Sequence, residues 1–165
     1  MELRISFSKT GSDISVDYKL KSAVRAAISA TLIHENFKYD ADVSVTFTDN
    51  AHIRKLNKKY RNVDKHTDVL SFPLYEDGEF DESECAHGAS LGDIVISLER
   101  AEEQAMELGN AYIYEVAFLS VHSTLHLLGY DHERSEEDDA LQCERQRVIM
   151  EYIDEKINFE ELESQ

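Results

Sequence analysis

The sequence predicts a single α/β (α+β) domain, in which a mixed sheet of about four strands packs with about five helices. The first reason is length, because 165 residues suit one domain that buries roughly 68–70% of its unfolded surface. The second is periodicity, because segments in which apolar and polar residues alternate are interleaved with segments of helical spacing. No internal repeat or linker interrupts this order, so the domain is predicted to span residues 1–165.

The first half of the chain predicts two strands, each followed by a helix. Residues 3–8 (LRISFS) and 42–48 (DVSVTFT) alternate apolar and polar side chains, as half-buried strands do. Apolar residues recur at helical spacing over about 17–36. Asp49 or Asn50 can cap a second helix directly after the second strand, because both side chains accept hydrogen bonds from free backbone N–H groups.

The second half predicts two further strands, separated by a long acidic loop. The strand at 67–74 contains the only proline, Pro73, which suits an edge strand or a strand end. The loop covers 75–90, and the fourth strand covers 91–99. We expect 158–165 to be a flexible tail. Three helices are predicted at roughly 98–108, 111–128 and 135–157.

The net charge of −17 alone argues against a nucleic-acid partner, since phosphate binding needs local positive charge. The bases are concentrated, however, in one stretch at 54–65, which contains only one acid, Asp64. Such a stretch is either a solvated helix face or a binding surface. Its six basic residues are Arg54, Lys55, Lys58, Lys59, Arg61 and Lys65.

Nothing in the sequence predicts a membrane location. The N-terminus lacks the apolar core of a signal peptide, and no apolar run approaches about 18 residues. The two cysteines match no zinc or disulfide spacing. We therefore expect a cytoplasmic protein with no membrane partner.

The segment HSTLHLLGYDH, residues 122–132, has the spacing of a metal site. His122 and His126 lie four apart, so on a helix of about 3.6 residues per turn they share one face. A continuing helix would carry His132 about 9 Å further along the axis. Gly129 removes this obstacle, because glycine is the favoured helix terminator and lets the chain turn back.

Three histidine ligands leave the fourth position of a tetrahedral zinc site open, which is the catalytic pattern. The spacing also resembles the second half of the metzincin metalloprotease motif. In those enzymes a glutamate follows the first histidine as general base, whereas Ser123 occupies that position here. The ligand set is therefore present and the peptidase base is absent. Asp131 either orients a ligand imidazole or forms the turn. Asp68 and Asp93 are expected to bind backbone groups.

Three blocks together, YRNVDKHTDVLSFP, LGDIVIS and HSTLHLLGYDH, resemble the YbeY-type metal-dependent endoribonucleases, which are bacterial rRNA maturation factors. The resemblance runs from about Leu56 to His132. It implies one zinc ion per chain on His122, His126 and His132, and a functional role for Arg61. It also implies cleavage of single-stranded RNA in the maturation of the 3′ end of small-subunit rRNA and in ribosome quality control.

Two positions depart from the pattern of this family. Glycine is usual where Ser123 stands, and proline is usual where His66 stands. We expect Ser123 to narrow the space beside the metal. Neither residue is an expected ligand.

The basic stretch fits an RNA substrate. Arg61 can pair its planar guanidinium with two phosphate oxygens, and the remaining bases can hold the RNA backbone. Two alternatives remain at this point: another zinc metallohydrolase such as a peptidase, and a ribosome-assembly binding protein with a structural metal. The sequence leaves open whether water or the 2′-hydroxyl of RNA is the nucleophile.

Overall fold

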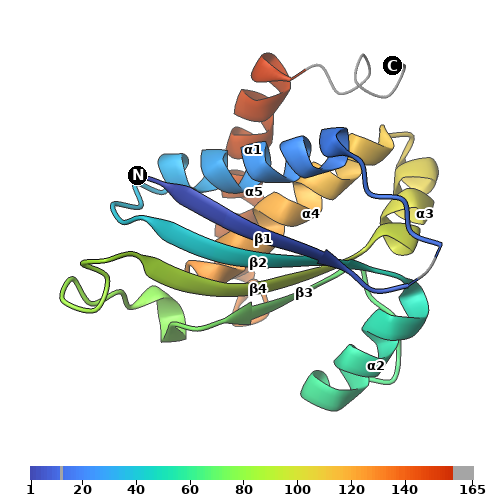
Figure 1. Cartoon of the computed structure of the whole chain (residues 1–165), viewed down its shortest axis with the longest axis horizontal. Coiled ribbons are helices and arrows are strands. Elements are labelled where there is room, and N and C mark those ends of the chain that lie inside the picture. Colours follow the sequence, from blue (N-terminus) through green and yellow to red (C-terminus); the bar gives the residue numbers. More distant parts are fainter. Residues whose placement is uncertain (12, 158–165) are drawn as a thin grey trace.

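A mixed sheet forms the centre of the computed structural model, which describes residues 1–11 and 13–157 (Figure 1). Within these residues the sheet has four strands in the order β1-β2-β4-β3. β1, β2 and β4 run parallel, and β3 pairs with β4 in the antiparallel direction. The strands span Leu3–Lys9 (β1), Ala41–Thr48 (β2), Val69–Pro73 (β3) and Ala89–Ser97 (β4).

The described residues also form five α-helices, so the predicted fold class is confirmed. One face of the sheet is covered by α1 and α4, with α5 packed outside them, and α2 lies on the opposite side (Figure 1). The helices span Tyr18–His34 (α1), Asn50–Arg61 (α2), Leu98–Leu108 (α3), Tyr112–Leu127 (α4) and Glu136–Lys156 (α5), and Glu76–Gly78 forms a short 3₁₀ turn (η1). None of the helices in these ranges is long and apolar enough to cross a membrane.

Side-chain caps explain where four of the helices begin. Asp17, Asp49, Ser97 and Ser135 each accept a hydrogen bond from a backbone N–H in the first turn of α1, α2, α3 and α5. At α2 the bond runs from the His52 backbone N–H to Asp49 over 2.9 Å. Of the two predicted caps for α2, the structure therefore selects Asp49.

Around the acidic loop the predicted boundaries were partly wrong. β3 is an edge strand that ends at Pro73, as expected, because a proline there removes no sheet hydrogen bond. The loop predicted at 75–90 contains η1, and its last two residues already belong to β4. β4 ends at Ser97 because this side chain caps the next helix. The tail predicted at 158–165 lies outside the described residues.

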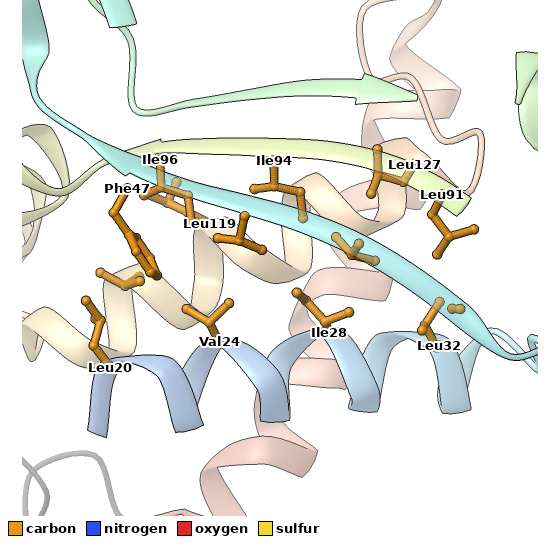
Figure 2. Packing of buried hydrophobic residues seen from close by; sticks show 14 of the residues in the cluster. Leu20, Val24, Ile28, Leu32, Phe47, Leu91, Ile94, Ile96, Leu119 and Leu127 are labelled. Atoms are coloured by element: carbon orange, nitrogen blue, oxygen red, sulfur yellow. The ribbon is translucent and has the colours of Figure 1, made fainter. Parts of the chain in front are cut away.

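The core lies between α1, the sheet and α4. Side chains of α1 at four-residue spacing project toward side chains of β2, β4 and α4 (Figure 2). Those labelled in the figure are Leu20, Val24, Ile28, Leu32, Phe47, Leu91, Ile94, Ile96, Leu119 and Leu127. A second cluster joins α1, α4 and α5, so α4 contributes to both. A third, smaller cluster of Ile53, Leu70 and Val95 lies under α2.

The turn after α4 packs directly against η1. Gly129 has φ +104°, and a Cβ there would lie 2.6 Å from the carbonyl carbon of Asp77. Gly78 is also closely packed, since a Cβ on it would collide with the Leu128 carbonyl oxygen. Arg134 pairs with Asp77 across the same contact. Glycine is therefore required at 129 for two reasons, its backbone conformation and the close approach of η1.

We predict that Gly129→Ala lowers the free energy of unfolding by roughly 3 kcal/mol or more, because strain and collision add. Gly109→Ala is the matched control. Gly109 also ends a helix with positive φ, but a Cβ there meets nothing within 4 Å. Gly109→Ala should lower the free energy of unfolding by only about 1–2 kcal/mol, because it carries the cost of the backbone conformation without a collision. Urea denaturation of both variants measures the difference, and equal losses would show that η1 yields to the added methyl group.

Candidate metal centre

The three histidines of the HSTLHLLGYDH segment meet at one point. His122 and His126 extend from the same face of α4, with ring centroids 4.8 Å apart. The His132 ring lies 5.2 Å from the first and 5.1 Å from the second. One ring nitrogen from each residue lies within 4.8 Å of the others, and His126 Nε2 is 3.1 Å from His132 Nδ1. The predicted convergence of the three side chains is therefore present.

The end of α4 brings His132 to this point. α4 ends at Leu127, and the backbone N–H groups of Gly129 and Tyr130 donate to the carbonyl oxygens of His126 and Leu125. These bonds close the last turn while Gly129, with its positive φ, redirects the chain. The glycine thus acts as the sequence predicted.

A partly buried hydrogen-bond network holds the turn that carries His132. The Tyr130 hydroxyl donates to Glu35 Oε2 over 2.7 Å, and Arg145 Nε donates to Glu35 Oε1 over 2.7 Å. Burial, followed by the bond to Glu35, raises the pKa of Tyr130 to about 12. The turn is thereby tied to the end of α1 and to α5. No local motif in the sequence signalled these three residues.

Two glutamines of α5 support His122. Gln146 Oε1 lies 2.5 Å from His122 Nδ1. An amide oxygen only accepts hydrogen bonds, so this contact assigns the ring hydrogen to Nδ1 and leaves Nε2 free to bind a metal. Gln142 Nε2 donates to the His122 carbonyl oxygen over 3.4 Å. Both glutamines are buried, and their four-residue spacing on α5 was the one signal available in the sequence.

Asp131, the residue predicted to orient a ligand, lies in the turn. Its Oδ1 accepts the Glu133 backbone N–H over 3.0 Å, and its Oδ2 lies 3.4 Å from Arg134 Nε. This is the arrangement of a turn-forming aspartate. A role for Asp131 toward a ligand imidazole stays a prediction.

The electrostatic setting favours neutral imidazoles. Burial, more than any other cause, lowers the pKa of His122 and lowers that of His126 to about 4. Charge on the neighbouring histidines lowers both further. Neutral rings keep the nitrogen lone pair that a metal ion needs. The convergence of the three ring nitrogens, with neutral imidazoles favoured at His122 and His126, therefore fits a metal ion that prefers imidazole.

A cleft of about 720 Å³ opens beside the trio and crosses the edge strand β3. The histidines line one side, and Tyr60 and Arg61 at the end of α2 line the other. An ion pair joins the two sides, because Arg61 Nη2 lies 3.1 Å from Glu133 Oε1. The trio fits a metal ion and faces this cleft. A substrate that enters the cleft can therefore reach the three histidines.

Of the six bases in the predicted stretch, Arg61 lines this cleft. Arg54 is engaged elsewhere, with its Nε 2.9 Å from Asp64 Oδ1. Asn57 is buried and donates to the Lys65 carbonyl oxygen over 2.9 Å, which fixes the chain after α2. The exposed lysines of the stretch are Lys55, Lys58, Lys59 and Lys65.

Ser123 lies between α4 and β3 and not on the cleft surface. It is buried, and its Oγ is 2.5 Å from Ser71 Oγ. The expectation that Ser123 narrows the space beside the metal is therefore not met, since Ser71 is the serine that lines the cleft. Asp68 also lines it, and its carboxylate accepts the Val69 N–H over 2.7 Å and Gln104 Nε2 over 3.2 Å.

The fold and the site define a class of protein, an α/β domain with a cluster of three histidines that could hold a metal ion at the end of a buried helix. Residues 6–154 match the model of the family described as Endoribonuclease YbeY, and the chain belongs to this family.

Relatives and a solved structure agree with this assignment. The chain is 45% identical to Endoribonuclease YbeY of Clostridium botulinum strain Hall over 157 residues, which cover 87% of this chain and 89% of the relative. It is 53% identical to Endoribonuclease YbeY of Caldanaerobacter subterraneus subsp. tengcongensis over 139 residues, or 81% and 87% of the two chains. The solution structure of the Thermotoga maritima protein TM1509 matches with a TM-score of 0.62 at 27% identity, covering 92% of this chain and 90% of that one.

We predict that the metal-free protein loses stability as the pH falls from about 7 toward 4. The folded pKa of His126, about 4, lies below the ordinary 6.5, so in this range the unfolded chain binds more protons. Urea unfolding of chelator-treated protein at pH 7 and pH 5 measures the loss. His126→Gln should reduce it, whereas His87→Gln, at an exposed position, should not. An identical loss in His126→Gln would contradict the assignment.

Proposed function

We propose that the protein is a zinc-dependent, single-strand-specific endoribonuclease of the cytoplasm. Its proposed substrate is rRNA, at the 3′ end of the small-subunit molecule, and its proposed roles are rRNA maturation and ribosome quality control. The observation that carries this proposal is the convergence of His122, His126 and His132 on a cleft that Arg61 lines from the other side. The names of the relatives support RNA as the substrate.

The three imidazoles suit one zinc ion per chain, because zinc binds neutral histidine nitrogens and accepts a site with three protein ligands. A zinc ion held there would supply Lewis-acid chemistry. Hydrogen bonds from neighbouring residues position the histidines. Gln146 fixes the His122 ring, and the Tyr130–Glu35–Arg145 network holds the turn before His132.

Arg61 is the proposed contact to the phosphate that is cleaved. Its planar guanidinium can donate two parallel hydrogen bonds to phosphate oxygens and offset the charge that develops on them. In the structure this guanidinium is paired with Glu133 at the surface. A phosphodiester entering the cleft would replace that carboxylate. The exposed pair is weak in water, so the exchange is energetically accessible.

The exposed lysines extend the positive surface from Arg61 along α2 and the segment that follows it. We propose that Lys55, Lys58, Lys59 and Lys65, with a smaller share from the Asp64-paired Arg54, hold the RNA backbone. The net charge of −17 repels RNA from the rest of the surface. Together the two effects would orient the strand toward the cleft.

The nuclease explains the site better than the two alternatives. A peptidase of the metzincin type needs a carboxylate after the first histidine, and Ser123 instead bonds to Ser71. A purely structural metal would be closed off by protein ligands, whereas a cleft opens beside this trio.

Zinc removal is the direct test of the proposed activity. Purified protein should contain one zinc ion and cleave single-stranded RNA, and chelator should abolish cleavage until zinc is restored. His126→Ala should lose both zinc and cleavage, while His87→Ala, at an exposed position outside the trio, should keep both. Elemental analysis and a gel assay on single-stranded and duplex RNA give the readouts. Full zinc in His126→Ala, or peptide cleavage with intact RNA in the wild type, would overturn the proposal.

Arg61→Glu should reduce RNA cleavage by roughly 10²- to 10³-fold, the loss typical of removing one transition-state donor. Arg61→Lys should recover only part of the rate, because an ammonium makes no bidentate contact. Zinc content should not change in either variant. Glu133→Gln frees Arg61 from its partner, and it should tighten RNA binding by no more than about 5-fold. Unchanged cleavage in Arg61→Glu would remove the residue from the mechanism.

A further inference from the structure

An aromatic pair forms the wall of the cleft beside Arg61. Tyr60, near the end of α2, and Phe72, on β3, both line the cleft. Their ring centroids are 5.2 Å apart and their planes meet at 67°. The pair therefore joins the end of α2 to the edge strand in the lining of the cleft.

The two rings differ in burial. Phe72 is half-buried and packs against the cluster of Ile53, Leu70 and Val95, which fixes its position. Tyr60 is 58% exposed. The Lys59 ammonium lies 5.1 Å from the Tyr60 ring centroid, on an exposed side chain. The pair thus presents an accessible aromatic ring supported by a fixed one.

We propose that Tyr60, supported by Phe72, is a stacking site for one unpaired nucleobase of the substrate. This inference rests on the proposed RNA substrate and assigns it a specific contact. Tyr60 directly precedes Arg61 in the chain, so a phosphate on the guanidinium brings the base of a neighbouring nucleotide to the ring.

The chemistry of the surroundings favours a nucleobase. Bases are flat and uncharged, so they are not repelled by the acidic surface of the protein, and they stack on an exposed aromatic ring in water. Lys59 can leave the ring for an adjacent phosphate, to which it is more strongly attracted. A base inside a duplex already has both faces covered. The site would therefore accept any base but only from a single strand, which gives a physical reason for single-strand specificity.

The absence of tryptophan from the sequence allows the contact to be observed directly. Tyr60→Trp introduces a fluorophore at the site in the zinc-loaded protein. A short single-stranded RNA, with 2′-O-methyl groups to slow cleavage, should quench its fluorescence, while the matching duplex should not. Tyr18→Trp is the control, because Tyr18 is also exposed but begins α1 and does not line the cleft. An unquenched Tyr60→Trp in the presence of bound RNA would overturn the proposal, as would quenching by an unstructured peptide in place of RNA.

Abasic substitutions test the same contact without a new fluorophore. Tyr60→Ala should weaken binding of the single strand by roughly 5- to 150-fold, and Tyr60→Phe, which keeps the ring, should not. An RNA lacking one base, moved along the strand in turn, should weaken wild-type binding at one position. Tyr60→Ala should be insensitive to the missing base at that position. Equal sensitivity of both proteins at every position would overturn the stacking site.

These measurements separate this inference from the proposed function. If the wild type neither binds nor cleaves RNA, the proposed function fails and the stacking site fails with it. If Tyr60→Ala binds and cleaves single-stranded RNA as the wild type does, the stacking site alone is wrong. Circular dichroism and zinc content verify that each variant is folded and loaded.

Discussion

The enclosure of α4 is the constraint on which the rest of the structure depends. Its side chains enter two hydrophobic clusters, one against the sheet and one against α1 and α5. Ser123 binds the helix to β3 as well. The face with His122 and His126 is the part that opens to the cleft. Burial around these imidazoles lowers their pKa values and so favours the neutral rings that a metal ion binds.

The third histidine depends on a different kind of support. His132 lies outside the helix, so its position is set by the turn at Gly129 and by what holds that turn. Tyr130 ties the turn to α1 and α5, and η1 packs against its other side through Asp77 and Gly78. Three segments that are distant in the chain thus fix one histidine of the trio. The acidic loop between β3 and β4 contributes to the site through this packing and through the ion pair of Asp77 with Arg134.

The cleft combines opposite chemical requirements in a small space. Metal binding needs neutral imidazoles, which burial favours, whereas binding of a phosphodiester needs positive charge. The structure separates these needs by placing the trio on one side of β3 and Arg61 on the other. In the absence of substrate, Glu133 balances the guanidinium. In the proposed function, an acidic protein in this way keeps one cation available for an anionic substrate, and the proposed stacking residue Tyr60 lies beside it.

The sequence by itself determined the features that depend on spacing along one element. These include the strand and helix order, the shared face of His122 and His126, and the helix end at Gly129, since periodicity and glycine conformation are local properties. Only the tertiary structure decided which partners complete the site. Gln146 reaches His122 from 24 residues away, and Tyr130 reaches its carboxylate partner across 95. Such contacts are set by how helices pack against one another. The pattern within one segment indicates which of its faces is buried, but not which side chains from other segments contact that face.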